Sequence, residues 1–335
     1  MTRTYGSLRL TAENQWEVSN LESHVAIRLK QIFARIPKHQ SGAFLLPNDL
    51  AHAADIEWFT ARYPLAVSDA DREALHGGRL AFEGNQAEME RILQPSHEMP
   101  AYVGLRPGKA VRHYQAQAVE VLMRAKGLLV GDEVGLGKTF ITAAACLAPG
   151  TLPAAIVCKT HLQRQWFDVL TEFTTLRVHE IRGTRPYKLP PADVYIFRYS
   201  QIAGWVDTYR EMQFKLVAFD EIQELRTGRS TAKGAAAWAL CEYADFKLGL
   251  TATPIYNYGN EIWHIVEFLR PGLLGTWFEF TVEWLAGRVV KNPDALGMFL
   301  REQYAFLRRT KKDVGQEPAT TVNVDTDNSN VKSIG

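Results

Sequence analysis

Cysteine is scarce in this chain of 335 residues, and its placement is informative. The three cysteines, Cys146, Cys158 and Cys241, lie far apart and form no C-x-x-C pair. This spacing argues against a disulfide framework and against a zinc site, and it fits a reducing compartment. We therefore expect core cysteines in an intracellular protein of the cytoplasm, nucleoid or nucleus.

Long apolar runs and an excess of one charge are also missing. No stretch approaches the roughly eighteen apolar residues of a spanning helix, and the first residues lead into no apolar secretion signal. We expect no membrane partner. Lys plus Arg number 38 against 37 for Asp plus Glu, so no overall positive field points to nucleic acid. Local basic patches remain compatible with nucleic-acid binding.

A glycine-rich loop between an apolar run and a helix start is the strongest chemical signal. Its backbone N–H groups can bind phosphates, its lysine can reach the outer phosphates and its threonine can bind magnesium. The general pattern has glycine where this chain has Asp132. A plain strand-to-helix turn is the alternative interpretation. The residues concerned are Gly135, Gly137, Lys138 and Thr139.

Two adjacent carboxylates end another apolar run. Leu216–Phe219 is followed directly by Asp220 and Glu221. Magnesium favours one or two carboxylates with phosphate oxygens, so Asp220 can hold the metal while Glu221 polarises water. An isolated Asp-Glu pair is usually a solvated loop. We expect this pair on a strand next to the phosphate-loop strand, where it would lie beside Lys138.

A third apolar run ends in two hydroxyl side chains. Lys247–Leu250 is followed by Thr251 and Thr253. By themselves such residues are typical of turns and helix caps. Their position after a buried strand makes them candidates for the same edge of the sheet.

From about residue 110, apolar runs alternate with helical stretches. This pattern predicts an α/β fold with a doubly wound, mostly parallel sheet that binds ligands at the carboxyl ends of its strands. Residues from about 260 to 316 are expected to be mainly helical, with core residues Trp263, Trp277, Phe280 and Trp284. The expected strands are Leu128–Val130, Ala154–Val157, Val194–Phe197, Leu216–Phe219 and Lys247–Leu250.

Residues 1–100 are expected to form a small α+β accessory domain, followed by a Pro- and Gly-rich linker at Pro95–Pro107. Helices are expected over Leu21–Ile36 and Asn48–Arg62. The expected extended pieces are Ser7–Leu10, Phe44–Leu46 and Leu65–Val67, and the expected core aromatics are Trp16, Trp58 and Phe59.

Together these segments resemble superfamily 2 helicase-type ATPases and, among them, the Swi/Snf-related double-stranded DNA translocases. The family's motif I also begins with aspartate. A basic segment like Phe306–Val314 closes the first lobe in the Swi/Snf-related group, and it separates that group from ordinary unwinding helicases. The resemblance spans Val111 to about Val324, and the matching segments are Val111–Ala118, Asp132–Thr139, Ile156–Trp166, Phe197–Ser200, Asp220–Gln223, Leu250–Asn257 and Phe306–Val314.

The resemblance implies a RecA-like ATPase lobe over residues 101–316 that uses ATP and Mg²⁺. It implies catalytic roles for Lys138, Asp220 and Glu221, with Thr139 and Asp220 at the metal. The implied nucleotide contacts are Gln115 at the adenine edge, Asp132, Gly135, Leu136, Gly137, Lys138, Thr139 and Gln223. The implied contacts to DNA, or couplings to it, are Lys159, Thr160, Tyr199, Ser200, Thr251 and Thr253.

Two departures from the family pattern matter. Gln223 stands where histidine is common in motif II, although an amide can still donate and accept a hydrogen bond. Nothing after Val324 resembles the second lobe, which in this family supplies arginine fingers and half of the DNA track. We expect residues 317–335 to be a polar tail leading to a second lobe in a longer chain or a partner subunit, and ATP hydrolysis by this chain alone to be weak.

The sequence thus predicts the N-terminal part of an ATP-dependent translocase whose partner is double-stranded DNA, including forked or branched duplexes. One alternative is a non-catalytic nucleotide- or DNA-binding subunit. Another is a motor on RNA, or a strand-separating or restriction-type motor. Residues 1–100 have two alternative roles: they recognise a fork or junction in DNA, or they only stabilise the ATPase lobe.

Overall fold

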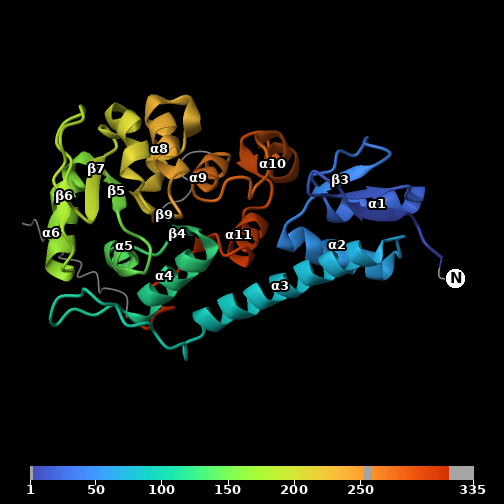
Figure 1. Ribbon diagram of the computed structural model, residues 1–335, viewed down its shortest axis with the longest axis horizontal. Coiled ribbons are helices and arrows are strands. Elements are labelled where there is room, and N and C mark those ends of the chain that lie inside the picture. Colours follow the sequence, from blue (N-terminus) through green and yellow to red (C-terminus); the bar gives the residue numbers. More distant parts are fainter. Residues whose placement is uncertain (1–2, 253–258, 317–335) are drawn as a thin grey trace, which may run out of the picture.

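The chain begins with a three-stranded antiparallel sheet packed on helices, the blue part of Figure 1. The computed structural model describes residues 3–252 and 259–316. Strands β1 (Ser7–Leu10), β2 (Gln15–Ser19) and β3 (Phe44–Pro47) lie in that order, with helices α1 (Ser23–Ile32) and α2 (Leu50–Arg62) against them. Alternate side chains such as Trp16 and Val18 point into the core, as the pleat requires.

One expectation for this region is wrong. Trp58 is 61% exposed, because the buried residues Ala53, Ile56 and Phe59 define the inner face of α2 and Trp58 falls outside it. The extended piece expected at residues 65–67 is present as an isolated parallel bridge, in which Ala66 pairs with Ser7. Trp16 and Phe59 are buried, as predicted.

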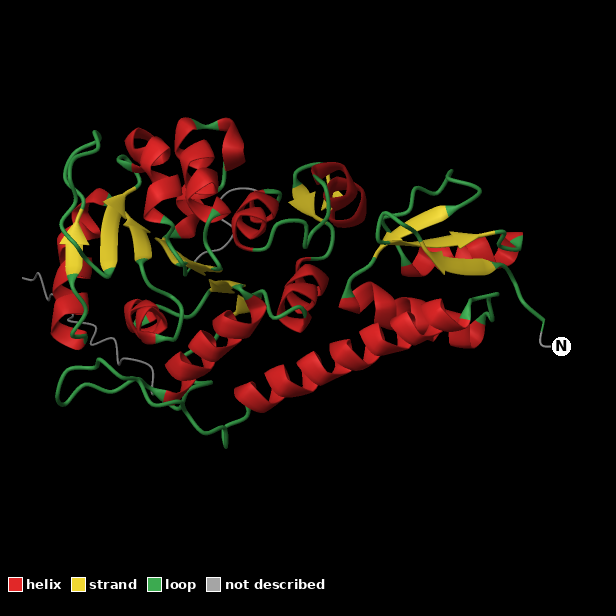
Figure 2. Cartoon of the chain, viewed as in Figure 1, coloured by secondary structure: helices red, strands yellow, loops and turns green. Residues whose placement is uncertain are grey.

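One long helix, α3 (Asp69–Leu93), connects this unit to the rest of the chain. Figure 2 shows it running beneath both parts. Leu75 near its start belongs to the N-terminal core, whereas Met89 and Ile92 near its end belong to the core of the larger sheet. The helix is therefore a structural member of both units. The division of the chain at about residue 100 stays a prediction.

Among the described residues, seven parallel strands form the main sheet in the order β12-β4-β9-β8-β5-β7-β6. All five strands expected from the apolar runs are present, which confirms the α/β fold. Two further strands are too short to stand out in the sequence, since β6 has three residues and β12 has two. The strands are β4 (Gly127–Val130), β5 (Ala154–Cys158), β6 (Val178–Glu180), β7 (Val194–Arg198), β8 (Leu216–Asp220), β9 (Phe246–Leu250) and β12 (Phe306–Leu307).

Helices cover both faces of this sheet (Figure 1). Alternate strand residues separate two cores: Leu128 and Val130 face one, and Leu129 faces the other. The first core includes α4 (His113–Ala125), α5 (Lys138–Leu147) and α6 (Gln163–Phe173). The second includes the 3-10 helices η2 (Ile202–Thr208) and η3 (Ile222–Leu225), with α7 (Tyr209–Met212), α8 (Ala232–Glu242) and α9 (Glu261–Leu269). Two more 3-10 helices are η1 (Thr160–Leu162) and η4 (Gly228–Ser230).

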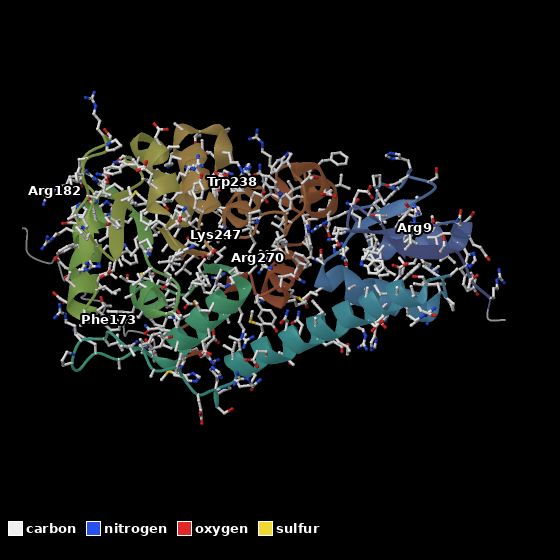
Figure 3. The ribbon with its side chains drawn as sticks, in the orientation of Figure 1. Arg9, Phe173, Arg182, Trp238, Lys247 and Arg270 are labelled. Carbon is white, nitrogen blue, oxygen red and sulfur yellow. The ribbon has the colours of Figure 1, made fainter. Side chains whose placement is uncertain are left out.

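The region after residue 260 is helical only in part. Helices α10 (Trp277–Trp284) and α11 (Pro293–Glu302) flank a short hairpin of β10 (Leu285–Ala286) and β11 (Val289–Val290), and β12 then returns to the main sheet. Phe280 is buried, but Trp277 is 39% exposed, contrary to expectation. Arg270, which directly follows α9 and is labelled in Figure 3, ties the region together by donating to the carbonyl of Gln303 at 3.2 Å.

The three cysteines are free and buried, which agrees with the core role expected for them. In the described parts of the chain, no helix has both the length and the hydropathy to cross a membrane.

Candidate active site

The predicted site residues meet at one edge of the sheet because three strands end in register. Val130 of β4 pairs with Leu250 of β9, which pairs with Asp220 of β8. The phosphate loop therefore starts level with the acidic pair. The expectation that β4 and β8 are neighbours is wrong, since β9 lies between them and brings Thr251 into the middle of the row.

The phosphate loop depends on glycine at two points. Gly135 and Gly137 have φ angles of +92° and +74°, in the left-handed region that favours glycine. A Cβ at Gly137 would also lie 2.8 Å from Nε2 of Gln115. Helix α5 begins directly afterwards at Lys138, so its unpaired N–H groups face the hollow of the loop. This is a cradle for an anion.

Lys138 folds back into the cradle. Its Nζ donates to the carbonyl of Asp132 at 2.6 Å. Burial lowers the pKa of Lys138, and the negative charges of Asp132, Glu221 and Asp220 oppose that shift. The lysine is thus within electrostatic reach of the acidic pair, as its predicted role requires. Phosphate oxygens could replace the carbonyl as its partner.

Asp220 is oriented by two aromatic residues. The indole of Trp166 donates to Oδ2 of Asp220 at 2.9 Å, and the hydroxyl of Tyr199 donates to the backbone carbonyl of Asp220 at 3.0 Å. Burial raises the pKa of the Asp220 carboxyl, while Trp166 and the positive charge of Lys138 partly offset the shift. A buried carboxylate with this raised pKa would gain most from a bound cation.

Glu221 has an unusual backbone and a close partner. Its φ angle is +53°, rare for a residue with a side chain, and its carboxylate accepts a hydrogen bond from the amide of Gln223. Oε1 of Gln223 is buried and has no hydrogen-bond partner among the described residues. This unsatisfied acceptor beside a carboxylate offers a place for a water molecule.

The donor set fits magnesium with a triphosphate. Thr139 follows Lys138 in the first turn of α5, directly after the phosphate loop. Asp220 ends β8, which is separated from the phosphate-loop strand β4 by β9 alone. Among the described residues, no cluster of three or more His, Cys, Asp or Glu side chains could hold a metal by itself. A hydroxyl and one carboxylate leave most positions of a magnesium ion to phosphate and water oxygens, which is its usual preference.

Two of the predicted nucleotide contacts have their side chains engaged inside the protein. Gln115 donates from Nε2 to the carbonyl of Leu136 at 3.1 Å and accepts at Oε1 from the backbone of Arg112. Asp132 is fully buried and bonded to Arg309. Sequence reasoning missed Arg309, although a charged residue at the usual glycine position already calls for a nearby cation.

The predicted DNA-side residues Lys159, Thr160, Tyr199 and Ser200 line a second pocket of about 530 Å³. Sequence reasoning missed two members of this pocket. Lys233 of α8 pairs with Glu224 at 2.9 Å, and Lys159 lies 3.7 Å from the same carboxylate. Burial would raise the pKa of Glu224, but the bond from Lys233 and the charges of Lys233 and Lys159 hold it below its usual range.

Tyr199 links the two sites, because it lines the second pocket while its hydroxyl bonds Asp220. It is only 7% exposed. Thr251 is buried at the end of β9, where its N–H donates to the carbonyl of Val130 at 3.0 Å. Thr253 lies outside the described residues.

A profile of the SNF2-related domain matches residues 57–326 of the sequence. The chain belongs to the SNF2-related family. Human TATA-binding protein-associated factor 172 is 25% identical over 255 residues, covering 62% of this chain and 13% of that protein. An uncharacterized ATP-dependent helicase of Mycoplasma genitalium is 25% identical over 223 residues, covering 62% of this chain and 21% of that protein.

A solved structure supports the same fold. The SWI2/SNF2 ATPase core of Sulfolobus solfataricus in complex with dsDNA has a TM-score of 0.56 and 24% identity, covering 65% of this SNF2-related chain and 48% of that chain. The RecA-like arrangement of the main sheet is therefore shown. This chain spans a small part of its curated relatives and about half of that ATPase core.

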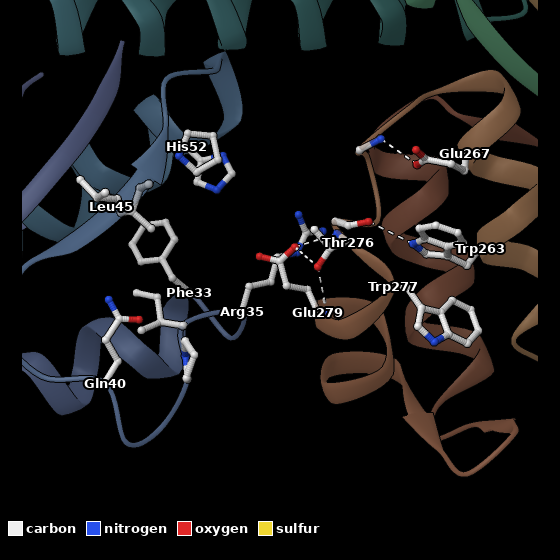
Figure 4. Close-up of a pocket in the computed structure, with 16 residues that line it drawn as sticks. Phe33, Arg35, Gln40, Leu45, His52, Trp263, Glu267, Thr276, Trp277 and Glu279 are labelled. Carbon is white, nitrogen blue, oxygen red and sulfur yellow. Dashed lines mark hydrogen bonds between the residues drawn. The ribbon is translucent and has the colours of Figure 1, made fainter. Parts of the chain in front are cut away.

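Another pocket, of about 650 Å³, lies away from this chemistry, where the N-terminal unit faces α9 and α10 of the SNF2-related lobe. Figure 4 shows Phe33 and Leu45 on one side and Trp263 and Trp277 on the other. Arg35 bridges the gap, donating to the carbonyl of Leu273 at 2.9 Å and to Glu283 at 3.2 Å. The pocket thus lies at the interface between the N-terminal unit and the lobe.

Proposed function

We propose that this chain carries the first ATPase lobe of an ATP-driven translocase on double-stranded DNA. The observation that carries the proposal is the single row of strand ends at β4, β9 and β8, with the anion cradle at one end and Asp220 and Glu221 at the other. Ligands of doubly wound sheets bind at this edge. Membership of the SNF2-related family supports ATP as the ligand.

The proposed roles follow the geometry of the row. The loop from Gly135 to Gly137 and the ammonium of Lys138 would hold the phosphates. Thr139 and Asp220 would hold Mg²⁺, which neutralises charge on the transferred phosphate when bound. Glu221, whose carboxylate accepts a hydrogen bond from Gln223, would orient and polarise the attacking water. Gln115 would meet the adenine edge with the second N–H and the second oxygen lone pair of its amide, beside its bonds to Leu136 and Arg112.

Double-stranded DNA is the proposed track. The Sulfolobus ATPase core is described in complex with dsDNA, which supports the same partner here. The pocket of Lys159 and Lys233 supplies cations for a backbone phosphate, and Thr160 and Ser200 add hydroxyl donors. Tyr199 connects that pocket to Asp220, so it is the proposed route by which DNA affects the nucleotide site.

A second lobe is proposed to complete the ATPase, in a longer chain or a partner subunit. This chain covers 48% of the Sulfolobus ATPase core. The described residues supply the phosphate loop and the acidic pair. The partner lobe would supply the arginine that stabilises charge in the transition state.

Binding of an ATP analogue in the presence of magnesium tests the site. A ligand that binds only the native state must raise the melting temperature, so the wild-type chain should show a magnesium-dependent increase. Lys138→Ala should abolish that increase. Lys215→Ala is the matched control, because Lys215 precedes β8 and lies at the opposite edge of the sheet. Unchanged affinity in Lys138→Ala would count against the assignment.

Residues 1–100 are proposed to favour forked or branched duplexes. Their unit is fixed to the lobe by α3 and Arg35, so it could contact DNA beside the track. Fluorescence anisotropy with labelled forked and linear duplexes of equal length measures the preference. Equal affinities would leave this unit with the alternative role of stabilising the lobe.

A further inference from the structure

The segment after α11 runs along the phosphate loop as a strap. Strand β12 pairs in parallel with β4, and the pairing continues beyond both strands. The N–H of Gly131 donates to the carbonyl of Leu307 at 2.7 Å, and the N–H of Glu133 donates to the carbonyl of Arg309 at 2.9 Å. The carboxylate of Glu133 accepts from the N–H of Lys311 at 2.8 Å. We call residues 306–311 the strap.

Arg309 of the strap forms an ion pair with Asp132, the residue that stands where the general phosphate-loop pattern has glycine. Its Nη2 donates to Oδ2 of Asp132 at 2.5 Å, and its Nε donates to Oδ1 at 3.1 Å. The backbone N–H of Arg309 also donates to Oδ1 at 3.0 Å. Asp132 is 0% exposed and the Arg309 side chain is 14% exposed, so this two-pronged pair is shielded from water.

Asp132 connects this pair directly to the phosphate-binding lysine. Its carbonyl accepts from Nζ of Lys138 at 2.6 Å, while its side chain is held by Arg309. Arg309 also donates from Nη1 to the carbonyl of Tyr114, and the hydroxyl of Tyr114 donates to the carbonyl of Leu136 at 2.8 Å. The guanidinium of Arg309 thus holds the start of the loop directly, through Asp132. It holds the end of the loop indirectly, through Tyr114 and the carbonyl of Leu136.

The buried carboxylate of Asp132 needs a cation beside it. Without a cation it would be an unpaired charge inside the protein, and it would repel an incoming triphosphate. The planar fork of arginine neutralises both oxygens at fixed geometry, which lysine cannot do. The general phosphate loop has glycine here and needs no such partner.

We propose that Arg309 is a positioning residue for the phosphate loop, so that nucleotide affinity depends on the strap being docked. Arg309 neutralises Asp132 and holds the loop open in the shape that accepts phosphates. The inference rests on the proposed nucleotide site, but it concerns a residue that does not touch the nucleotide. Any movement that lifts the strap would weaken nucleotide binding.

Substitutions at Arg309 test the inference by nucleotide titration and by hydrogen exchange. In Arg309→Ala, an ATP analogue with magnesium should bind at least about tenfold more weakly, and amides of residues 132–138 should exchange faster in the nucleotide-free protein. Arg309→Lys should fall between wild type and Arg309→Ala, because it keeps the charge and loses one prong. The exposed neighbour Arg308 provides the control, and Arg308→Ala should match wild type in both measurements.

A double substitution separates positioning from direct contact. In Asp132→Gly the buried charge is gone, so adding Arg309→Ala should change nucleotide affinity little. If Arg309→Ala weakens binding in the Asp132→Gly background by the same factor as in wild type, Arg309 acts independently of Asp132 and the inference is wrong. If Arg309→Ala does not fold, comparison of Asp132→Gly with the double variant still decides the question.

The two proposals can fail separately. Absence of nucleotide binding in the wild-type chain would overturn the proposed function, while hydrogen exchange in the free protein would still report whether Arg309 orders the loop. Wild-type affinity together with unchanged loop exchange in Arg309→Ala would overturn the positioning role and leave the nucleotide site standing.

Discussion

The buried carboxylate of Asp220 lowers the stability of the folded chain, although it is the proposed ligand of magnesium. Its carboxyl is buried at the end of β8, and burial raises its pKa although Trp166 and Lys138 favour the charged form. The charged carboxylate therefore lowers the free energy of unfolding at neutral pH. As pH falls through the raised pKa, the native chain takes up a proton before the unfolded chain does, and this cost disappears.

Asp220→Asn should accordingly raise the melting temperature of the ligand-free chain at pH 7 and abolish magnesium-dependent nucleotide binding. The gain in stability should shrink as pH is lowered, since wild type then becomes neutral as well. Differential scanning fluorimetry across pH measures it. Asp245→Asn, at an exposed site beside Lys215, is the control. A melting temperature lower than wild type would show that the carboxylate stabilises the free chain.

In wild type, metal-dependent binding should be lost at a higher pH than for an ordinary aspartate, because magnesium needs the deprotonated carboxylate.

Glu224 lowers the positive charge of the pocket proposed to bind DNA. Its carboxylate lies between Lys159 and Lys233 and already neutralises part of their charge. Glu224→Gln should strengthen binding to linear duplex by about fivefold, the size of one partly exposed ion pair. Lys233→Ala should weaken it and reduce the slope of log affinity against log salt by about one. Anisotropy titrations at several salt concentrations measure both effects.

The control for these variants is Lys215→Ala, at the opposite edge of the sheet, which should leave the salt slope unchanged. A Glu224→Gln variant that binds DNA more weakly would mean that the carboxylate orients the lysines instead of competing with DNA for them.

At the scale of elements, close packing of α2 on α3 depends on one glycine. A Cβ at Gly78 would lie 2.7 Å from Cβ of Ala53, whereas a Cβ at Gly77 would meet nothing within 4 Å. Gly77→Ala should raise the free energy of unfolding by about 0.5–1 kcal/mol, because alanine favours helix. Gly78→Ala should lower it by about 1–3 kcal/mol through overpacking. Urea denaturation of the pair measures both, and stabilisation by Gly78→Ala would contradict the close contact.

Elements with a strong apolar pattern could be predicted from the sequence, and elements held by context could not. The five central strands stand out because both faces of the sheet are covered, which makes each strand an apolar run. Helix α3 was missed because it buries only Leu75, Met89 and Ile92 and contains three glycines. Strand β12 has two residues and exists through its pairing with β4.

The site shows the same division. Lys138, Asp220 and Glu221 could be placed at one edge because parallel strands share a carboxyl end. Arg309 and Trp166 could not, since each reaches its partner across a large gap in sequence and only the folded chain brings them together. Lys233 lies only nine residues after Glu224, but no sequence pattern links the two side chains.

At the scale of the whole molecule, this chain should bind nucleotide but hydrolyse it slowly. The charge of the transition state would lack an arginine from a second lobe, and loss of such a group costs roughly a thousandfold or more in rate. Steady-state ATPase assays with and without duplex DNA measure the turnover, with Lys138→Ala to reveal contaminating activity. Fast, DNA-stimulated turnover by this chain alone would mean that no second lobe is needed.

Helix α3 has a mechanical consequence for the whole assembly. It has 25 residues and is anchored in a hydrophobic core at each end, so it works as a stiff lever arm about 37 Å long. A tilt of about 10° at the ATPase end would sweep the opposite end through roughly 6 Å, given that length. Because Arg35 holds the N-terminal unit to Glu283 and to the carbonyl of Leu273, a tilt of this size would have to break both contacts.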